Sequence, residues 1–531
     1  MSGYTVQNLP RGWRKAPLGT LVTILRGVSY KKQDATTEPA VGNIPILRAT
    51  NIGDRLSLSG LVYVPKDCVS QDQMLNIGDI VIAASSGSQQ VVGKAAVLTE
   101  PWVGSFGAFC YALRPCAKET AGYLAFFLQT ATYRNHVASL CAGVNINNLR
   151  RKDIESVLLP VAPLNEQRRI VAKVEELFSE LDKGIESLKT ARRQLEVYLQ
   201  SVLRHAFEGK LTAQWRKENK DKLETPEQLL TRIRKERMAH HERQLQEWKP
   251  NANGGERTIR RSLASSRTSL KDVSRLSSQE TEDLPFLPSG WSYVRLGLLI
   301  DEPKYGTSKK CDYNFEGTGV LRIPNVVRGV IDDADLKGAC FEEHEKLAYS
   351  LRSGDILMIR SNGSISIVGK CALVSSAEQR YLYAGYLIRI RSNPTVVLPD
   401  YLAALMSSHL VRVQIEGCAR STSGVNNINS GEIQSLIVPL CGVQEQQEVV
   451  ARLSAVISRM DATATEIDEQ LRTTNTLRQT ILKKAFAGHL VAQDPSDEPA
   501  SVLLEKIRTE RAKAGMNGPT ARKNRKAKTA A

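Results

Sequence analysis

An apolar stripe that occurs twice is the feature that most constrains the fold of this chain. In residues 163–211, apolar side chains recur at steps that sum to seven, and an altered copy follows in residues 442–490. Apolar residues at this spacing form one stripe along a helix, so each copy predicts one long helix. The stripe of the first copy consists of Val174, Leu177, Leu181, Leu188, Leu195, Val202 and Ala206. The matching stripe of the second copy is expected to consist of Leu453, Val456, Met460, Ile467, Leu477, Ile481 and Ala485.

Both ends of each expected helix carry boundary signals. Glu166 and Glu445 stand just inside the two N-termini, where the helix dipole favours negative charge. Gly209 and Gly488 close the two copies and are expected to take the left-handed cap conformation. The first helix, from Asn165 to Phe207, would be about 65 Å long at about 1.5 Å per residue. An apolar stripe on so long a helix needs a partner, and the other copy is the expected one. In the alternative, each stripe packs on its own globular domain.

The repeat extends beyond the helices, so we interpret the chain as a tandem duplication. Four short motifs return in the same order. They are Leu-Pro-x-Gly-Trp (9–13 and 287–291), Leu-Arg-x-x-Asn (47–51 and 321–325), Gly-Asp-Ile (78–80 and 354–356) and Val-Gly-Lys (92–94 and 368–370). A short helix is also duplicated, because residues 229–237 match residues 503–511.

Each repeat opens on a segment of mixed α and β character. Short apolar or alternating runs bounded by Gly, Pro and Asn predict strands at 44–48, 79–84, 93–98 and 109–114. Helical spacing follows over 121–140. The sequence therefore predicts an α+β chain with two pseudo-repeated α/β domains and two long paired helices. The expected segments are a first domain (9–160), a helical region (163–249), a serine-rich basic linker (250–286), a second domain (287–439), a second helical region (442–511) and a basic disordered tail (512–531).

The charge of the chain indicates a polyanionic partner. Its 72 Lys and Arg residues against 56 Asp and Glu give a formal charge of +16. Charge alone does not choose between DNA, RNA and an acidic membrane, but an apolar run of about 18 residues and an N-terminal export signal are both lacking. Nine cysteines without a CxxC pair and seven histidines without ligand spacing argue against zinc. We expect a cytoplasmic protein without a membrane association.

Sequence patterns of catalysis are weak. Residues 315–319 spell the FxGxG pattern of nucleotide and S-adenosylmethionine loops, which requires a preceding buried strand and a following helix. Here a polar run precedes the pattern and a strand-like run follows it, so a turn is favoured over an enzyme site. Residues 87–94 and 363–370 resemble phosphate loops, but five residues separate their glycines where four are required. We expect no catalytic site and no metal site.

Polar loops at repeated positions are the candidate DNA contacts. Ser, Asn, Gln and Arg side chains read base edges or hold phosphates. For the asparagines of the Gly-Val-Asn loops, the competing interpretation is that they only stabilise a turn. For Lys94 and Lys370, DNA contact and a purely structural role are equally favoured. The candidates are Arg48, Asn51, Ser85, Ser86, Ser88, Gln89, Lys94, Asn145, Asn147, Arg322, Asn325, Arg360, Ser361, Asn362, Ser364, Lys370, Asn426 and Asn427.

The order of these motifs resembles the specificity subunits of type I restriction-modification enzymes. Each repeat opens on Leu-Pro-x-Gly-Trp, carries Gly-Asp-Ile before a polar loop, and enters its long helix through Pro163-Leu164-Asn165-Glu166-Gln167 or, less faithfully, residues 441–446. The resemblance implies that domains 9–160 and 287–439 are target recognition domains, each of which reads one half of an asymmetric, split DNA sequence. It also implies that the two helices form an antiparallel coiled coil that sets the distance between the halves. The chain departs from the usual pattern at the long linker and at Gly442, where proline is usual.

The resemblance also implies a division of labour in a larger complex. The chain itself is expected to be non-catalytic and to bind no cofactor. Two modification (methyltransferase) subunits would use S-adenosylmethionine to methylate adenine, and two restriction subunits would use ATP and Mg for translocation and cleavage. In the alternative, the chain is a stand-alone two-domain DNA-binding or architectural protein without such partners.

Overall fold

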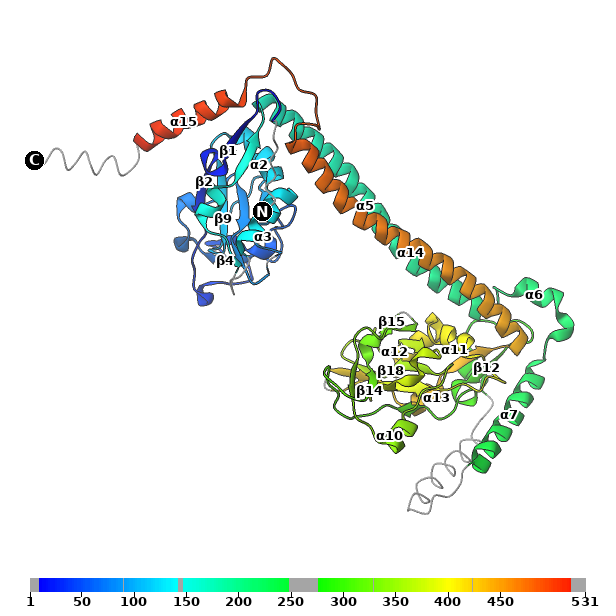
Figure 1. Cartoon of the computed structure of the whole chain (residues 1–531). Helices are drawn as coiled ribbons and strands as arrows, with labels where there is room; N and C mark the ends of the chain where they lie inside the picture. The colour runs from blue at the N-terminus through cyan, green and yellow to red at the C-terminus, as the bar shows by residue number, and fades with distance from the viewer. Residues whose placement is uncertain are drawn as a thin grey trace, which may run out of the picture. The chain divides into compact units, whose positions relative to one another are not determined.

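The computed structural model describes residues 9–88, 90–141, 147–247, 276–327, 329–422 and 424–516. The chain divides into two compact units, one of residues Met1–Lys189 with Ile467–Ala531 and one of residues Thr190–Glu466. Each unit contains one mixed domain and part of both long helices, α5 (Leu164–Phe207) and α14 (Val443–Phe486). Figure 1 shows the elements of each unit.

The first domain contains two sheets. The larger is antiparallel with strand order β2-β9-β5-β7, and the smaller has the order β4-β3-β8, in which β3 and β8 run parallel. Their bounds are β2 Val22–Arg26, β3 Asn43–Leu47, β4 Val62–Pro65, β5 Ile80–Ala83, β7 Ala95–Val97, β8 Ser105–Phe106 and β9 Cys110–Pro115. β3, β5, β7 and β9 confirm the four strands predicted from the sequence.

The expected helix over 121–140 is two helices in the structure. α2 (Ala121–Phe127) ends before Thr130, and α3 (Ala131–Cys141) begins after it. The hydroxyl of Thr130 donates to the Phe127 carbonyl at 2.7 Å and accepts the Tyr133 N–H at 3.2 Å. A threonine that pairs with backbone groups on both sides favours a turn over a continuous helix.

The second domain repeats this topology. Its larger sheet has the order β13-β22-β18-β20 and its smaller sheet the order β17-β14-β21. The bounds are β13 Lys304–Tyr305, β14 Thr318–Leu321, β17 Lys337–Ala339, β18 Ile356–Ile359, β20 Cys371–Leu373, β21 Leu382–Tyr383 and β22 Leu387–Ile390. Helices α10 (Glu343–Ala348), α11 (Pro399–Met406), α12 (His409–Cys418) and α13 (Ser430–Ser435) complete it. The repeated motifs of the sequence therefore correspond to one repeated fold.

A strand pair closes each domain beside a long helix. β1 (Arg14–Pro17) pairs antiparallel with β11 (Leu158–Val161), and α5 begins three residues later. In the second domain, β12 (Ser292–Arg295) pairs with β25 (Ile437–Leu440) before α14. The strand that follows the Leu-Pro-x-Gly-Trp motif is thus held against the strand that enters the helix.

The two long helices pair antiparallel, as predicted. In the first unit, Phe178 of α5 shares a core with Leu482 of α14, and Asp182 accepts a hydrogen bond from Arg478. In the second unit, Val202 of α5 shares a core with Leu453 of α14. Residue numbers rise along one helix as they fall along the other. Gly209 (φ +70°) and Gly488 (φ +73°) confirm the expected caps.

One residue of the expected stripe lies outside it. Leu477 is 45% exposed, whereas Thr474, three residues earlier, is 9% exposed. Equivalent positions of the two stripes are 279 residues apart, as for Val174 and Leu453. The position equivalent to Leu195 is therefore Thr474 and not Leu477. The prediction of Leu477 was therefore wrong, because a polar threonine occupies the position that the helical repeat places in the seam.

The duplicated short helices dock on the domain of the other repeat. α7 (Pro226–Glu247) follows α5 in the chain, and its Arg237 donates to the carbonyl of Gly297 in the second domain. α15 (Ala500–Met516) follows α14, and its Arg511 donates to the carbonyl of Gly19 in the first domain at 2.6 Å. Each domain is therefore contacted by segments of both repeats.

Parts of the expected linker and tail lie outside the described residues, namely 248–275 and 517–531. The described end of the linker contains a short helix, α9 (Ser278–Thr281), capped by Ser277. A search of the described residues finds no helix long and apolar enough to cross a membrane.

Candidate nucleic-acid interface

A short antiparallel strand pair joins two candidate segments of the first domain. β6 (Ser85–Ser86) pairs antiparallel with β10 (Asn147–Asn148), so that Asn147 lies opposite Ser86. The Leu149 N–H donates to the Ala84 carbonyl at 2.7 Å and continues the pairing. Gln89 and Asn145 lie outside the described residues. Ser85, Ser86, Asn147 and Asn148 thus form one polar edge.

The second domain builds the same edge from its own strands. β19 (Ser361–Asn362) pairs with β24 (Val425–Asn427), which pairs with β23 (Arg420–Thr422). Asn426 Nδ2 donates to the Gly363 carbonyl at 3.0 Å, and Oδ1 of Asn362 accepts the Ser364 N–H at 2.9 Å. The candidates Ser361, Asn362, Ser364, Asn426 and Asn427 are therefore brought together. We name the antiparallel pairs β6–β10 and β19–β24 the polar edges.

Arg360 precedes the second polar edge and is fixed by its surroundings. Its guanidinium lies 4.7 Å from the centre of the Tyr305 ring, and its Nη1 donates to the Gly385 carbonyl at 3.2 Å. The Tyr305 hydroxyl accepts the Ser430 N–H at 3.1 Å. In the first domain the same place is occupied by Ala84, since Ala84 and Arg360 both directly precede the paired strand. The two polar edges therefore differ in charge.

Two arginines that the sequence did not single out support the loops that continue from the polar edges. Arg134 of α3 donates to the carbonyls of Val92 at 2.8 Å and Gln90 at 2.7 Å. Arg412 of α12 donates to the carbonyls of Val368 and Ile365. Burial lowers the pKa of Arg134 from its ordinary value. The sequence signal that could have identified these two arginines is their repetition. Each lies in the second α-helix after the Val-Gly-Lys motif of its repeat.

Asn51 and Asn325, two further candidates, are buried inside their own loops. Asn51 accepts the Arg48 N–H at 3.0 Å and donates to the carbonyls of Ser57 and Ser59. Asn325 likewise accepts the Arg322 N–H at 2.7 Å and donates to the carbonyls of Asp332 and Asp335. Every amide atom already has a partner, so these asparagines stabilise a turn and are not available to bases.

The arginines of the same motif are also engaged within the domain. Arg48 Nη2 donates to the Gly60 carbonyl at 2.8 Å, although its side chain is exposed. Arg322 Nη2 donates to Oδ1 of Asp335 at 3.0 Å, and the guanidinium lies 5.6 Å from the Tyr313 ring centre. The Leu-Arg-x-x-Asn motif is therefore first of all a structural turn.

Lys94 and Lys370 are exposed but do not belong to the polar edges. Their carbonyls accept the N–H groups of Ala83 and Ile359 at 2.9 and 2.8 Å. Lys94 lines a pocket of about 280 Å³ that is also lined by Phe178, Arg478 and Leu482 of the helix pair. Lys94 therefore lies beside the helix pair of the first unit.

The Gly-Asp-Ile motif is structural in both domains. Asp79 is buried and accepts hydrogen bonds from Arg114, the closest at 2.7 Å, and these bonds raise the pKa of Arg114. Asp355 is paired in the same way with Arg391 at 2.6 Å. The repeated motif thus fixes the start of β5 and β18, directly before each polar edge.

The FxGxG pattern begins in a loop and ends inside β14, so a strand and not a helix follows the loop. Gly317 has φ +121°, and a Cβ there would lie 2.7 Å from the Ala339 carbonyl oxygen. The structure has a bend where a turn was expected, and β17 leaves no room for a side chain at Gly317.

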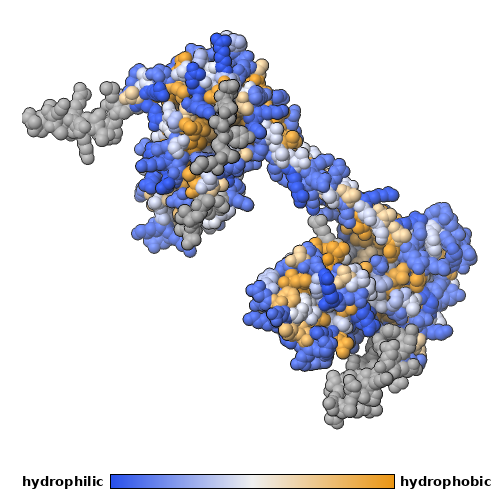
Figure 2. All heavy atoms as spheres, in the orientation of Figure 1, coloured by the Kyte–Doolittle hydropathy of each residue, from blue (hydrophilic) through white to orange (hydrophobic). Residues whose placement is uncertain are grey.

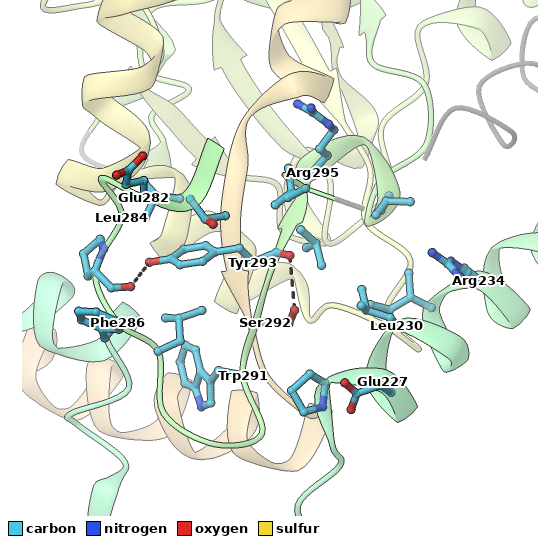
Figure 3. A pocket seen from close by; sticks show the side chains of 18 residues that line it. Glu227, Leu230, Arg234, Glu282, Leu284, Phe286, Trp291, Ser292, Tyr293 and Arg295 are labelled. Atoms are coloured by element: carbon cyan, nitrogen blue, oxygen red, sulfur yellow. Dashed lines mark hydrogen bonds between the residues drawn. The ribbon is translucent and has the colours of Figure 1, made fainter. Parts of the chain in front are cut away.

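A pocket of about 620 Å³ in the second unit is lined by none of the candidate residues. Figure 3 shows Glu227, Leu230 and Arg234 of α7 on one wall and Leu284 and Phe286 on the other. Tyr293 donates from its hydroxyl to the Pro285 carbonyl at 2.7 Å across it. The pocket lies where the end of the expected linker passes the duplicated helix.

Comparisons with known proteins agree on one family. A model described as the type I restriction modification DNA specificity domain matches residues 10–190. The chain is 32% identical to the type I restriction enzyme EcoKI specificity subunit of Escherichia coli (strain K12), over 96% of this chain and 97% of that one. It is 30% identical to the StySPI specificity subunit of Salmonella potsdam, with the same coverage. A solved structure that concerns complex assembly and conformational transition of the type I R-M system has a similar fold, with a TM-score of 0.60 and 18% identity over 91% of this chain and 100% of that one.

Proposed function

This chain belongs to the specificity subunits of type I restriction enzymes, and from that premise we propose that it is the DNA-recognition subunit of a restriction-modification complex. Each mixed domain would read one half of a split, asymmetric DNA target. The chain would then direct adenine methylation or restriction by partner subunits to that target.

The observation that supports two unlike half-sites is the pair of polar edges. Both lie directly after a buried strand, β5 or β18, that the Gly-Asp-Ile motif fixes. Their side chains differ, because Arg360 and Asn362 stand where the first domain has Ala84 and Ser86. Arginine prefers guanine and asparagine prefers adenine in the major groove, so unlike edges favour unlike base sequences. For this reason Ser85, Ser86, Arg360, Ser361, Asn362 and Asn426 remain our proposed DNA contacts.

We propose that the helix pair keeps the gap between the half-sites constant. Each helix has 44 residues, or about 66 Å at about 1.5 Å per residue. A rigid pair of this kind allows one spacing, because a slip of one base pair rotates a half-site around the duplex.

The partners follow from the family and are part of the proposal. Two modification subunits would bring S-adenosylmethionine and the methyl-transfer site, and two restriction subunits would use ATP and Mg. The chain itself would bind none of these cofactors, and it would act in the cytoplasm. The loop at 315–319 supports this division, because it opens a strand instead of the helix that a nucleotide loop needs.

The test compares the purified chain with the chain co-purified with its modification subunits. Binding to a library of random DNA duplexes should select one split sequence for the complex. Selection of the same sequence with the same affinity by the chain alone would support the stand-alone alternative. Binding without sequence preference in both samples would contradict the proposal.

A further inference from the structure

We propose that Phe109 and Tyr386 are DNA-contact residues, each of which presses its aromatic ring against the bases of the half-site that its domain reads. The inference rests on the proposed function and adds a specific contact to it. Neither residue belongs to a repeated sequence motif, and neither carries a charge.

The same tight turn presents both rings. In the first domain, the Cys110 N–H donates to the Gly107 carbonyl at 2.9 Å, which places Phe109 third in a four-residue turn before β9. In the second domain, the Leu387 N–H donates to the Ala384 carbonyl at 2.8 Å, which places Tyr386 third in the same turn before β22. The two domains thus show one aromatic residue at one structural position.

Each turn is bonded to the start of a polar edge. The Phe109 carbonyl accepts the N–H groups of Ala84 at 2.8 Å and Ser85 at 3.1 Å. The Tyr386 carbonyl accepts the Arg360 N–H at 3.0 Å, and the Arg360 side chain donates to Gly385 in the same turn. A ligand that contacts the polar edge therefore meets the aromatic turn beside it.

A glycine lies close against the backbone of each turn. A Cβ at Gly27 would lie 2.0 Å from the Gly107 carbonyl oxygen. A Cβ at Gly306 would lie 2.3 Å from the Tyr383 carbonyl oxygen and 2.4 Å from that of Ala384. Any larger side chain would displace the turn, so its backbone is confined from two sides while its ring is not.

The rings themselves are exposed. Phe109 is 69% and Tyr386 is 63% accessible to solvent, on a protein whose visible surface is mainly hydrophilic (Figure 2). Single exposed apolar residues are common and need no explanation. Two aromatic rings at the same place in both domains, each on a confined turn beside the candidate DNA contacts, are better explained by a shared contact.

DNA offers apolar surface that suits such a ring. The thymine methyl group and the faces of the bases are the apolar parts of the duplex, and aromatic or apolar side chains pack on both. Phe109 has no hydrogen-bonding group, so its contribution must come from this packing. The proposal therefore commits to ring contact with bases, and not to phosphate binding.

The experiment measures binding of a fluorescent duplex that contains the selected split target, with the complex of this chain and its modification subunits. Phe109→Ala and Tyr386→Ala should each weaken binding about 5- to 100-fold, the range of one aromatic–base contact. Tyr386→Phe, which keeps the ring, should bind more tightly than Tyr386→Ala. Val103→Ala and Leu347→Ala remove similarly exposed apolar side chains, 73% and 75% exposed, that belong to neither turn, and they serve as matched controls.

The half-site affected separates this inference from general damage. Phe109→Ala should reduce the penalty for base changes in one half of the target only, and Tyr386→Ala in the other half only. Wild-type affinity in both alanine variants, while the wild-type complex selects its split target, would overturn the inference and leave the proposed function standing. Failure of the wild-type complex to select any sequence would overturn the proposed function itself.

Discussion

The indole Nε1 of Trp13 donates a hydrogen bond to Oε2 of Glu166 at 2.9 Å, inside the core of the first unit. This bond joins the Leu-Pro-x-Gly-Trp motif to the first turn of α5. The second repeat uses the matching acid differently. Glu445 forms a buried ion pair with Arg216 and accepts the Thr212 hydroxyl at 2.5 Å, while Trp291 Nε1 has no partner among the described residues. The equivalent acids Glu166 and Glu445 thus have different partners. Glu166 accepts a hydrogen bond from a neutral indole, and Glu445 pairs with a guanidinium cation.

The pH dependence of stability should report the Glu166 site. Burial raises the pKa of Glu166 from its ordinary value of 4.5, although the bond from Trp13 opposes this. A carboxyl whose pKa is higher in the folded state binds more protons when folded. Its contribution to the free energy of unfolding is therefore full below the unfolded pKa and is lost as the pH rises through the folded pKa. Glu166→Gln removes this loss, so the excess of its thermal unfolding midpoint over that of wild type should grow as the pH rises above about 4.5.

Glu445→Gln is the matched variant and should act in the opposite direction. It leaves the Arg216 guanidinium buried without its carboxylate, which destabilises a protein by about 3–5 kcal/mol. The unfolding midpoint should therefore fall at neutral pH. Equal shifts of the same sign in both glutamine variants would contradict the different partners that the two acids have.

Truncation of apolar residues on α14 tests the seam of the helix pair. Ile467 is 6% and Leu477 is 45% exposed. Ile467→Ala should lower the free energy of unfolding by about 2–5 kcal/mol, while Leu477→Ala should change it by about 0.5 kcal/mol or less. Chemical denaturation of both variants measures the difference, and a larger loss for Leu477→Ala would refute the assigned seam.

The two loop-supporting arginines should act each on its own domain. Arg134→Ala removes two hydrogen bonds to the loop that continues from Ser88, and Arg412→Ala removes the equivalent bonds after Ser364. Hydrogen exchange of backbone amides should accelerate in residues 85–92 of the first variant and in residues 361–368 of the second. Each variant is the control for the other, and acceleration in both loops of either variant would argue against local support.

The sequence predicted the periodic and duplicated features well. Helical spacing placed α5 and α14 inside the expected stretches 163–211 and 442–490, and alternating apolar runs placed β3, β5, β7 and β9. These features are local, so residue type and spacing determine them. The antiparallel pairing came from the resemblance and not from the spacing.

Burial of polar residues could not be predicted in the same way. Asn51 and Asn325 have the residue type of a base contact, but partners six to ten positions away bury them in a turn. Conversely, Phe109 begins an apolar run that predicts a buried strand, and only the turn before β9 exposes it. The structure brings part of the candidate loops together at the polar edges, while the availability of single residues depends on tertiary contacts.

A change in helix length tests whether the helix pair measures the gap. Insertion of four residues, about one helical turn, after Leu188 shifts the second part of α5 against α14. The complex should then either methylate a target with an altered gap and unchanged halves or lose methylation. Methylation of the original target with its original gap would show that the helices do not set the spacing.

The most direct measurement is the methylome of a host that carries this chain with its modification subunits, compared with a host that lacks the chain. Our account predicts one two-part motif with a constant gap, unlike halves, and methylated adenine on both strands, present only in the first host. A continuous motif, a variable gap, or identical methylomes in the two hosts would contradict it.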